Sequence, residues 1–471
     1  MSKQKHTYGT LARNLLRWKN NLCNKSHIAQ NIDDEVFRNN LIEYNNQRHF
    51  GCDTTVCHVP MRSLYLGFDG IVSACCFNRN YVLGRFPENS IAEIIHGEKR
   101  KTLQKHLSET DFSYGCQFCK NMIAGSDYMS VGARFADAFP DKGDLPSEMI
   151  FELDNTCNLR CEMCNAKFSS VHDGGKRTVA PYDNDDFIEQ LKPFIPHLVE
   201  TKFLGGEPFL SDIYPKIWEL IIAINPECKI RIQSNGTVLN EKINTILQRG
   251  NFQIGLSIDT LNPDHYAKIR NGAKIENALE NIEFFSRISR KNGENMSISV
   301  CPMKENRFDI PELVKFCNDK DIFIYFNNVS TEGYALDELS EQELEELVIF
   351  YKENILKSSN YVSRYNDKVF SNLIRKVEYL MKQSKHKAYM DEMIHCTRDE
   401  FVKLISTIIS GNEDIDLKDM EYLMDYIPEN FLIKRSEYLY IKNEMKIDSI
   451  SNFLRQSKEK QIEHLNKILQ F

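Results

Sequence analysis

Three cysteines stand within eight residues, Cys157, Cys161 and Cys164, directly after the apolar stretch Met149–Leu153. Thiolates bind zinc or iron–sulfur clusters, and a closed site of either kind takes four ligands. Three thiolates therefore leave one coordination position open, at which a metal can bind and activate another molecule. The spacing alone also allows a zinc knuckle completed by a distant His or Cys.

A second group of cysteines lies nearer the N-terminus and has enough thiols for a complete shell. Its members are Cys52, Cys57, Cys75, Cys76, Cys116 and Cys119. Asp69 and Gly70 lie between two β-rich runs, which predicts a hairpin turn that brings Cys57 and Cys75 together. The later Cys-x-x-Cys can close a site of four thiolates. Such a shell fits structural zinc or an auxiliary iron–sulfur cluster, and spacing alone does not choose between them.

Composition limits the kind of protein that carries these thiols. The chain has 471 residues and a net charge of −8, and it lacks an uninterrupted apolar run long enough to cross a bilayer. The polar N-terminus does not predict export, so we expect a reducing cytoplasm, where clustered thiols bind metal or act chemically. The acidic balance does not favour nucleic acid as a partner. The remaining cysteines are expected in apolar cores: Cys23, Cys228, Cys301, Cys317 and Cys396.

The elements that must position the three clustered thiols alternate between β-rich runs and helical stretches. We expect strands at Met149–Leu153, Thr201–Leu204, Lys229–Gln233, Gln253–Ile258, Ser297–Val300 and Ile322–Phe326. Helical periodicity covers Ile213–Ile224 and Ile275–Arg290. This alternation predicts a parallel sheet, and six strands fit a partial (β/α)6 barrel of the TIM-like kind.

Unusual polar residues follow successive predicted strands. They are Gly205, Gly206, Glu207 and Pro208 after the second strand, Ser234 and Asn235 after the third, and Ser257 and Asp259 after the fourth. Glycines allow close backbone approach to a ligand, and a Glu carboxylate can accept from an ammonium group. Each motif taken alone is typical of a loop, a turn or a helix cap. Their order along one barrel edge favours a shared binding site.

The spacing of Cys157, Cys161 and Cys164 resembles the signature of the radical S-adenosylmethionine (radical SAM) enzymes. The resemblance implies that these thiols hold a 4Fe-4S cluster whose open iron binds SAM. Residues 205–208 look like the GGEP motif of that family, which holds the SAM amino group. Ser234, Asn235, Ser257 and Asp259 match positions that reach the ribose and carboxylate of SAM.

The stretch from Cys57 to Cys119 resembles the Twitch module, the shorter relative of the SPASM domain, which carries an auxiliary 4Fe-4S cluster. Here the module precedes the barrel, as in an N-terminal Twitch branch. The resemblance implies Cys57, Cys75, Cys116 and Cys119 as ligands, with Cys76 as the alternative to Cys75 and Cys52 as the alternative to Cys57.

These patterns predict four parts of the chain. They are an N-terminal helical extension (1–50), a Cys-rich α+β Twitch-like module (51–140), the partial barrel (141–330) and a helical C-terminal region (331–471). Arg134 and Asp137 are expected to be solvated. After about residue 330 we expect only helices, including Tyr361–Gln383, Asp391–Ile409 and Ile447–Leu469, which cover the barrel's open side, recruit substrate or form a passive packing layer.

The resemblance implies an enzyme that cleaves SAM reductively to a 5′-deoxyadenosyl radical and abstracts hydrogen from an unactivated C–H bond. A flavodoxin or ferredoxin would supply the electron. The first substrate hypothesis is a ribosomally made peptide, and the alternative is oxidation of a sugar or other small metabolite. A hypothesis of another class is a non-catalytic metal-binding interaction protein.

Overall fold

The computed structural model describes residues 32, 34–48, 55–175, 181–329, 331–392, 395–397 and 432–434. Backbone contacts divide the chain into two units. The first comprises Met1–Leu339 and Glu346–Val377, and the second comprises Ser340–Glu345 and Glu378–Phe471. Cys52 and the predicted helix Ile447–Leu469 lie outside the described residues.

A nine-stranded sheet in the order β3-β2-β1-β4-β5-β6-β7-β8-β9 is the centre of the first unit. Six consecutive parallel strands form the barrel part of this sheet: β4 (Glu148–Phe151), β5 (Glu200–Phe203), β6 (Lys229–Ser234), β7 (Phe252–Ser257), β8 (Ser297–Val300) and β9 (Phe323–Phe326). They coincide with the six predicted strands to within a residue or two at each end. The predicted α/β class with an open, partial barrel is confirmed.

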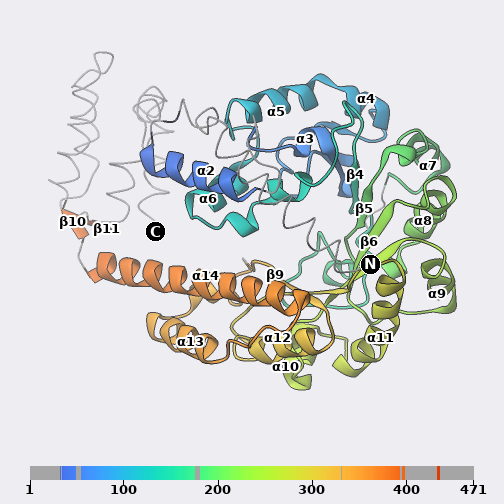
Figure 1. Ribbon diagram of the computed structural model, residues 1–471. Coiled ribbons are helices and arrows are strands. Elements are labelled where there is room, and N and C mark those ends of the chain that lie inside the picture. Colours follow the sequence, from blue (N-terminus) through green and yellow to red (C-terminus); the bar gives the residue numbers. More distant parts are fainter. Residues whose placement is uncertain are drawn as a thin grey trace, which may run out of the picture. The chain divides into compact units, whose positions relative to one another are not determined.

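Helices follow these strands and cover one face of the sheet. They are α7 (Asp185–Leu191), α8 (Ile213–Ile224), α9 (Glu241–Leu247), α10 (Pro263–Ile269), α11 (Ile275–Lys291) and α12 (Ile310–Asp319). Figure 1 shows α7, α8, α9 and α11 along one side of β4, β5 and β6. The apolar stripe of α8 explains this packing, because Trp218 is fully buried and its ring is in T-shaped contact with those of Phe203 and Phe252.

The other face of the parallel strands is charged. Side chains alternate between the two faces of a strand, so the neighbours of the helix-facing Phe203 point away from the helices. Among them, Lys202 lies 2.6 Å from a Glu148 oxygen and 3.5 Å from a Glu200 oxygen. Arg231 lies 2.8 Å from the other Glu200 oxygen. This face therefore offers hydrogen-bonding groups to a polar ligand.

The cysteine-rich module is built onto the same sheet. It contains β1 (Ser63–Leu66), β2 (Ile71–Ser73) and β3 (Gly84–Arg85) with helices α2 (Glu35–Gln47), α3 (Val59–Arg62), α4 (Ile91–His96), α5 (Glu98–Ser108) and α6 (Gln117–Ala124). The predicted hairpin is confirmed: β1 pairs antiparallel with β2, and Asp69 takes a left-handed turn conformation with φ 58°. β1 also pairs parallel with β4. Every residue of β1 is buried, as expected for an interior strand.

The first half of α14 (Tyr361–Glu392) covers the edge strand β9. The side-chain oxygen of Asn366 accepts the Ile324 N–H at 3.0 Å, and its amide nitrogen donates to the Ile322 carbonyl at 2.9 Å. A side chain thus replaces the strand partner that β9 lacks on this side. Helix α13 (Glu341–Glu353) precedes α14.

Two expectations about the chain outside the barrel are wrong. Residues after 330 are not all helical, because β10 (His395–Thr397) pairs with β11 (Leu432–Lys434) and interrupts the helix predicted at Asp391–Ile409. This pairing joins distant segments, which local periodicity does not report. Asp137 is not solvated: it is 3 % exposed and forms an ion pair with the buried Arg48 at 2.6 Å.

Candidate functional site

The three clustered thiols lie in the loop that follows β4. Backbone hydrogen bonds join this loop to the C-terminal end of α10 and the residues just after it: the Glu162 N–H donates to Ile269 and the Arg160 N–H to Asn271. Burial raises the pKa of Cys164 to about 11, and the nearby Cys161 and Cys157 thiols add to the rise. Three thiols in mutual electrostatic reach suit a metal or cluster, whose positive charge replaces their protons.

Gly205 and Gly206 pack against this cysteine loop. Both take positive φ angles, 82° and 49°. A Cβ at Gly206 would stand 2.2 Å from the Thr156 carbonyl oxygen, and one at Gly205 would stand 2.9 Å from Glu152. The close backbone approach predicted for these glycines is therefore made to the cysteine loop itself. Pro208 follows as a buried residue at the start of a short 3-10 turn.

The carboxylate of Glu207 collects donors from the next strand end. Its oxygens accept the Ser234 hydroxyl at 2.9 Å, the Asn235 N–H at 2.7 Å and the Phe209 N–H at 3.1 Å. The residue is 1 % exposed, and burial raises its pKa to about 7. Asn235 also donates to Asn158, within the cysteine loop, at 2.8 Å. The structure thus brings Glu207, Ser234 and Asn235 together beside the thiols.

The two residues predicted after the fourth strand are placed differently. Ser257 is half-buried and its hydroxyl accepts from the Gln233 amide at 2.9 Å. Asp259 is fully buried, and both of its oxygens have partners in the protein: Oδ2 accepts from Arg270 at 2.6 Å and Oδ1 from the Cys301 N–H at 2.7 Å. Asp259 therefore reaches the site through Arg270, which no sequence motif singled out.

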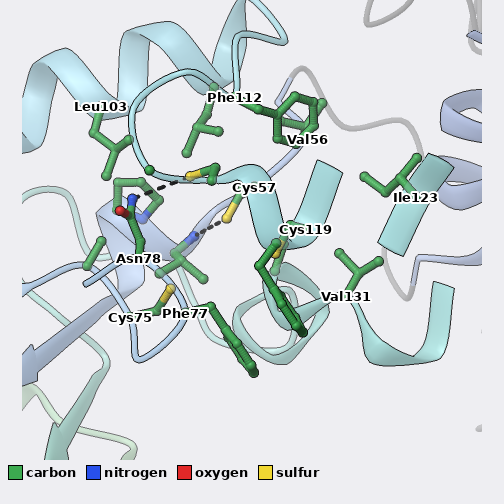
Figure 2. A pocket seen from close by; sticks show the side chains of 18 residues that line it. Val56, Cys57, Cys75, Phe77, Asn78, Leu103, Phe112, Cys119, Ile123 and Val131 are labelled. Carbon is green, nitrogen blue, oxygen red and sulfur yellow. Dashed lines mark hydrogen bonds between the residues drawn. The ribbon is translucent and has the colours of Figure 1, made fainter. Parts of the chain in front are cut away.

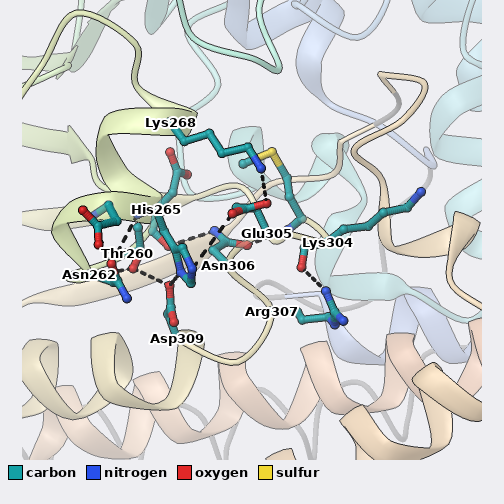
Figure 3. Close-up of polar contacts among 12 residues, drawn as sticks. Thr260, Asn262, His265, Lys268, Lys304, Glu305, Asn306, Arg307 and Asp309 are labelled. Carbon is teal, nitrogen blue, oxygen red and sulfur yellow. Dashed lines mark hydrogen bonds and ion pairs between the residues drawn. The ribbon is translucent and has the colours of Figure 1, made fainter.

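A polar network anchors α10 beside the cysteine loop (Figure 3). Thr260 donates to Asp309 at 2.6 Å, and the His265 ring nitrogen Nδ1 lies 2.7 Å from the same carboxylate oxygen. Asn262 caps the first turn of the helix by accepting the His265 N–H. Lys268 pairs with Glu305 at 2.6 Å on the exposed side. The start of α10 is thus tied to the loop that follows β8.

A cavity in the cysteine-rich module gathers the second group of thiols (Figure 2). Four of them, Cys57, Cys75, Cys116 and Cys119, line it together with mainly apolar side chains. The Val59 N–H points to the Cys57 sulfur at 3.4 Å, and the Asn78 amide points to the Cys116 sulfur at 3.4 Å. Four thiols with N–H donors and apolar walls fit an iron–sulfur cluster.

The adjacent residues Cys75 and Cys76 differ in whether they line this cavity. Cys75 is among the residues that line it and Cys76 is not. Burial raises the pKa of Cys76 to about 11, while the nearby Arg79 opposes the rise and Glu152 adds to it. Cys76 thus lies close to the end of β4 instead. The geometry favours Cys75 as the ligand, and the alternative Cys52 lies outside the described residues.

A buried contact joins the cysteine-rich module to the end of β4. Glu152 accepts the Tyr65 hydroxyl and pairs with Arg79 at 2.7 Å. The Arg79 guanidinium lies 5.2 Å from the centre of the Tyr65 ring and 5.0 Å from that of Phe168. Sequence reasoning missed this contact because Glu152 lies 73 positions from Arg79 and 87 from Tyr65, with no local pattern between them.

Within the described ranges, no three or more Cys, His, Asp or Glu side chains are arranged to hold one metal ion. The thiolates of a 4Fe-4S cluster bind different irons and need not converge on a single point. A search of the described helices finds none with the length and hydropathy that a membrane span needs.

An open parallel sheet with thiols at its carboxyl ends and a second, thiol-lined cavity define an α/β protein suited to two iron–sulfur clusters. Residues 152–317 match the radical SAM superfamily, and residues 57–121 match SPASM, described as an iron-sulfur cluster-binding domain. The chain thus contains a radical SAM domain, preceded by an iron–sulfur cluster-binding domain of the SPASM kind. The two domains imply 4Fe-4S clusters and SAM as cofactors.

Curated relatives include two GTP 3′,8-cyclases. The protein of Aliarcobacter butzleri is 25 % identical over 209 residues, which are 43 % of this chain and 60 % of that protein. The protein of Helicobacter pylori strain 26695 is 26 % identical over 197 residues, or 41 % and 59 %. The chain thus spans somewhat more than half the length of the curated relatives it matches.

Two solved structures are also similar over part of their length. SuiB of Streptococcus suis bound to S-adenosylmethionine has a TM-score of 0.33 and 16 % identity, covering 58 % of this chain and 52 % of SuiB. The anSMEcpe protein with bound AdoMet has a TM-score of 0.34 and 22 % identity, covering 44 % and 58 %.

Proposed function

We propose that the chain is an enzyme that starts radical chemistry with SAM at a 4Fe-4S cluster held by Cys157, Cys161 and Cys164. The observation that carries the proposal is that these three thiols and the buried Glu207 carboxyl meet at one edge of the sheet. When bound, the cluster and SAM supply a 5′-deoxyadenosyl radical that abstracts hydrogen from an unactivated C–H bond.

The residues around Glu207 prepare it to receive a positively charged group. Burial in a low-dielectric site disfavours the negative charge of the Glu207 carboxylate. The positive charge of a SAM ammonium group would stabilise that ionised form. Ser234 and the Asn235 N–H fix the orientation of its two oxygens. Gly205 and Gly206 keep the loop close to the thiols. We assign Asp259 a positioning role, since the charge of its carboxylate is already paired with the Arg270 guanidinium.

The second cavity supports an auxiliary 4Fe-4S cluster on Cys57, Cys75, Cys116 and Cys119. Its apolar walls exclude water, which slows loss of the cluster and limits the paths of an electron. A complete shell of four thiolates suits electron transfer rather than substrate binding. Electrons would enter from a flavodoxin or ferredoxin. The matched segments fall within the divisions proposed at 51–140 and 141–330.

The proposed substrate is a peptide. The sheet face turned away from the helices carries Lys202 and Arg231, which keep part of their side chains exposed beside the buried Glu200, so their remaining N–H groups can donate to the carbonyl groups of an extended backbone. The auxiliary-cluster module adds support, because the resemblance associates such modules with modification of ribosomally made peptides. The second candidate is oxidation of a sugar or other small metabolite. The names of the curated relatives, which act on GTP, favour it.

The test uses the full chain, purified and reconstituted without oxygen. Two 4Fe-4S clusters correspond to about eight irons per chain. We expect that iron content, reductive cleavage of SAM, and loss of about half the iron together with all cleavage in a variant with alanine at Cys157, Cys161 and Cys164. The control Cys228→Ala, a buried thiol outside both groups, should keep both properties. A colourless zinc protein that leaves SAM intact would refute the enzyme proposal and support the interaction protein.

A second experiment identifies the substrate class. Deuterium-labelled peptides, chosen from any short reading frames beside this gene, and labelled sugar nucleotides are incubated with the reduced enzyme and SAM. Transfer of deuterium into 5′-deoxyadenosine from the peptide supports the first candidate. Transfer only from the sugar rejects the peptide and supports the second.

A further inference from the structure

A buried arginine contacts the middle cysteine of the SAM-cluster loop. Arg270 caps the C-terminal end of α10, and its Nη1 lies 3.7 Å from the Cys161 sulfur. Cys161 is 8 % exposed and Arg270 9 %. An N–H donor at this distance, aimed at a sulfur inside the protein, is a hydrogen bond to a group that becomes a thiolate when it binds iron.

Asp259 fixes the direction of that guanidinium. Its Oδ2 accepts from Arg270 Nε at 2.6 Å, while its Oδ1 accepts the Cys301 N–H at 2.7 Å. The Asn306 amide donates to the Asp259 carbonyl at 2.8 Å and so holds the backbone as well. A carboxylate held on every side leaves its arginine partner little freedom to swing away from Cys161.

The helix that carries Arg270 is held at its other end too. Figure 3 shows Thr260 and His265 both directed at Asp309, with Asn262 at the first turn of α10. The helix is only two turns long, so fixing its start also fixes the position of Arg270. Two hydrogen-bond networks, one around Asp259 and one around Asp309, therefore hold the Arg270 guanidinium in place.

The physical effect of this contact follows from charge. A cation that donates to a cluster thiolate stabilises negative charge on sulfur, and the reduced cluster carries more negative charge than the oxidised one. Hydrogen bonds to cluster sulfurs are one of the terms that set reduction potentials. In a buried site this stabilisation is weakly screened by water.

We propose that Arg270 is a positioning residue that orients Cys161 as a ligand and raises the reduction potential of the SAM-binding cluster. The inference rests on the proposed function, since it requires that Cys157, Cys161 and Cys164 hold that cluster. Arg270 lies outside the Cys157–Cys164 motif, and in this proposal it changes how easily the cluster accepts an electron.

The test compares Arg270→Lys and Arg270→Gln with Lys268→Met in the full chain. Lys268 is an exposed cation on the same helix, paired with Glu305, so it controls for the loss of one positive charge without the sulfur contact. All variants carry alanine at Cys116 and Cys119, so that the SAM-binding cluster alone gives the signal. The readouts are iron content, the midpoint potential from an EPR-monitored redox titration, and the affinity for SAM.

We expect Arg270→Gln to lower the midpoint potential, Arg270→Lys to lower it less, and Lys268→Met to leave it unchanged. An unchanged potential in a loaded Arg270→Gln protein, with SAM affinity alone reduced, overturns the inference and makes Arg270 a SAM contact. If Arg270→Gln does not fold or bind iron, the test rests on Arg270→Lys. A midpoint potential in Arg270→Lys equal to that of the protein with Arg270 intact also overturns the inference. A parent protein that binds no iron would reject the proposed function itself.

Discussion

Glu207→Gln is expected to gain stability relative to wild type as the pH rises, and to bind SAM more weakly. Burial raises the pKa of Glu207 from 4.5 to about 7. The folded protein therefore holds a proton on this carboxyl more tightly than the unfolded chain does. The stability contributed by that proton is complete below about pH 4.5 and is lost as the pH rises through about 7. Glutamine is neutral at every pH and escapes this loss.

The size of the effect follows from the two pKa values. Between about pH 5.5 and about pH 8, wild type loses about 2 kcal/mol relative to the Gln variant by linkage. In the Gln variant an NH2 group replaces the oxygen that accepts the Asn235 N–H, and the loss of this hydrogen bond lowers the variant's stability by about 1–3 kcal/mol at both pH values. The advantage of the variant must therefore grow with pH, whatever its sign at pH 5.5. Loss of the charged partner of an ammonium group should weaken SAM binding by about 10- to 100-fold.

The assay follows urea unfolding of the metal-free protein by the fluorescence of Trp218, which is buried against the barrel sheet. Trp18→Phe removes the second tryptophan of the chain. Glu219→Gln, an exposed carboxylate on α8, is the matched control and should change stability by less than about 0.5 kcal/mol at either pH. A stability difference that stays constant with pH would refute the raised pKa. Unchanged SAM affinity would refute the binding role.

Three further predictions test other parts of the site. Alanine at both Cys116 and Cys119 should remove about half the iron and leave SAM binding intact, as measured by iron analysis and equilibrium dialysis; full retention of iron would exclude them as ligands. Asp137→Ala should cost about 3–5 kcal/mol in urea unfolding, because Arg48 stays buried without its carboxylate. Asp183→Ala breaks an exposed pair with Lys216 and should cost under about 1 kcal/mol, so equal losses would contradict the burial argument. Gly206→Ala should abolish iron loading at the first site, since its Cβ would meet the Thr156 oxygen at 2.2 Å. Gly143→Ala, at another positive φ with open space around it, should load iron normally. If both variants load iron, the loop around Thr156 can move to accept the added Cβ, and the prediction for Gly206 is wrong.

Sequence patterns were sufficient for the features that depend on short segments. The spacing of Cys157, Cys161 and Cys164 lies within one loop, so the covalent chain keeps these thiols close in any compact fold. The strand and helix periods of the barrel repeat over a few residues, and α8 begins and ends where its apolar pattern does. The Asp69-Gly70 turn likewise needs only local backbone preferences.

Other features depended on which distant segments meet. Cys75 and Cys76 are equivalent by spacing and lie in the bend and turn that follow β2, so only the packed module shows which of the two lines the cavity. Asp259 matched a SAM contact by position, but the structure engages both of its oxygens with Arg270 and Cys301.

By itself, the sequence determined the positions of the barrel strands and the spacing of the clustered thiols, because local periodicity and spacing carry that information, and this spacing resembles that of the radical SAM enzymes. Only the tertiary structure decided that β1 continues the barrel sheet, that Arg79 reaches Glu152 and that Arg270 reaches Cys161. Each of these contacts joins residues 73 to 109 positions apart, except the strand pairing, which joins whole segments. Such contacts arise from the burial of many side chains at once, and no pattern within a few residues records them.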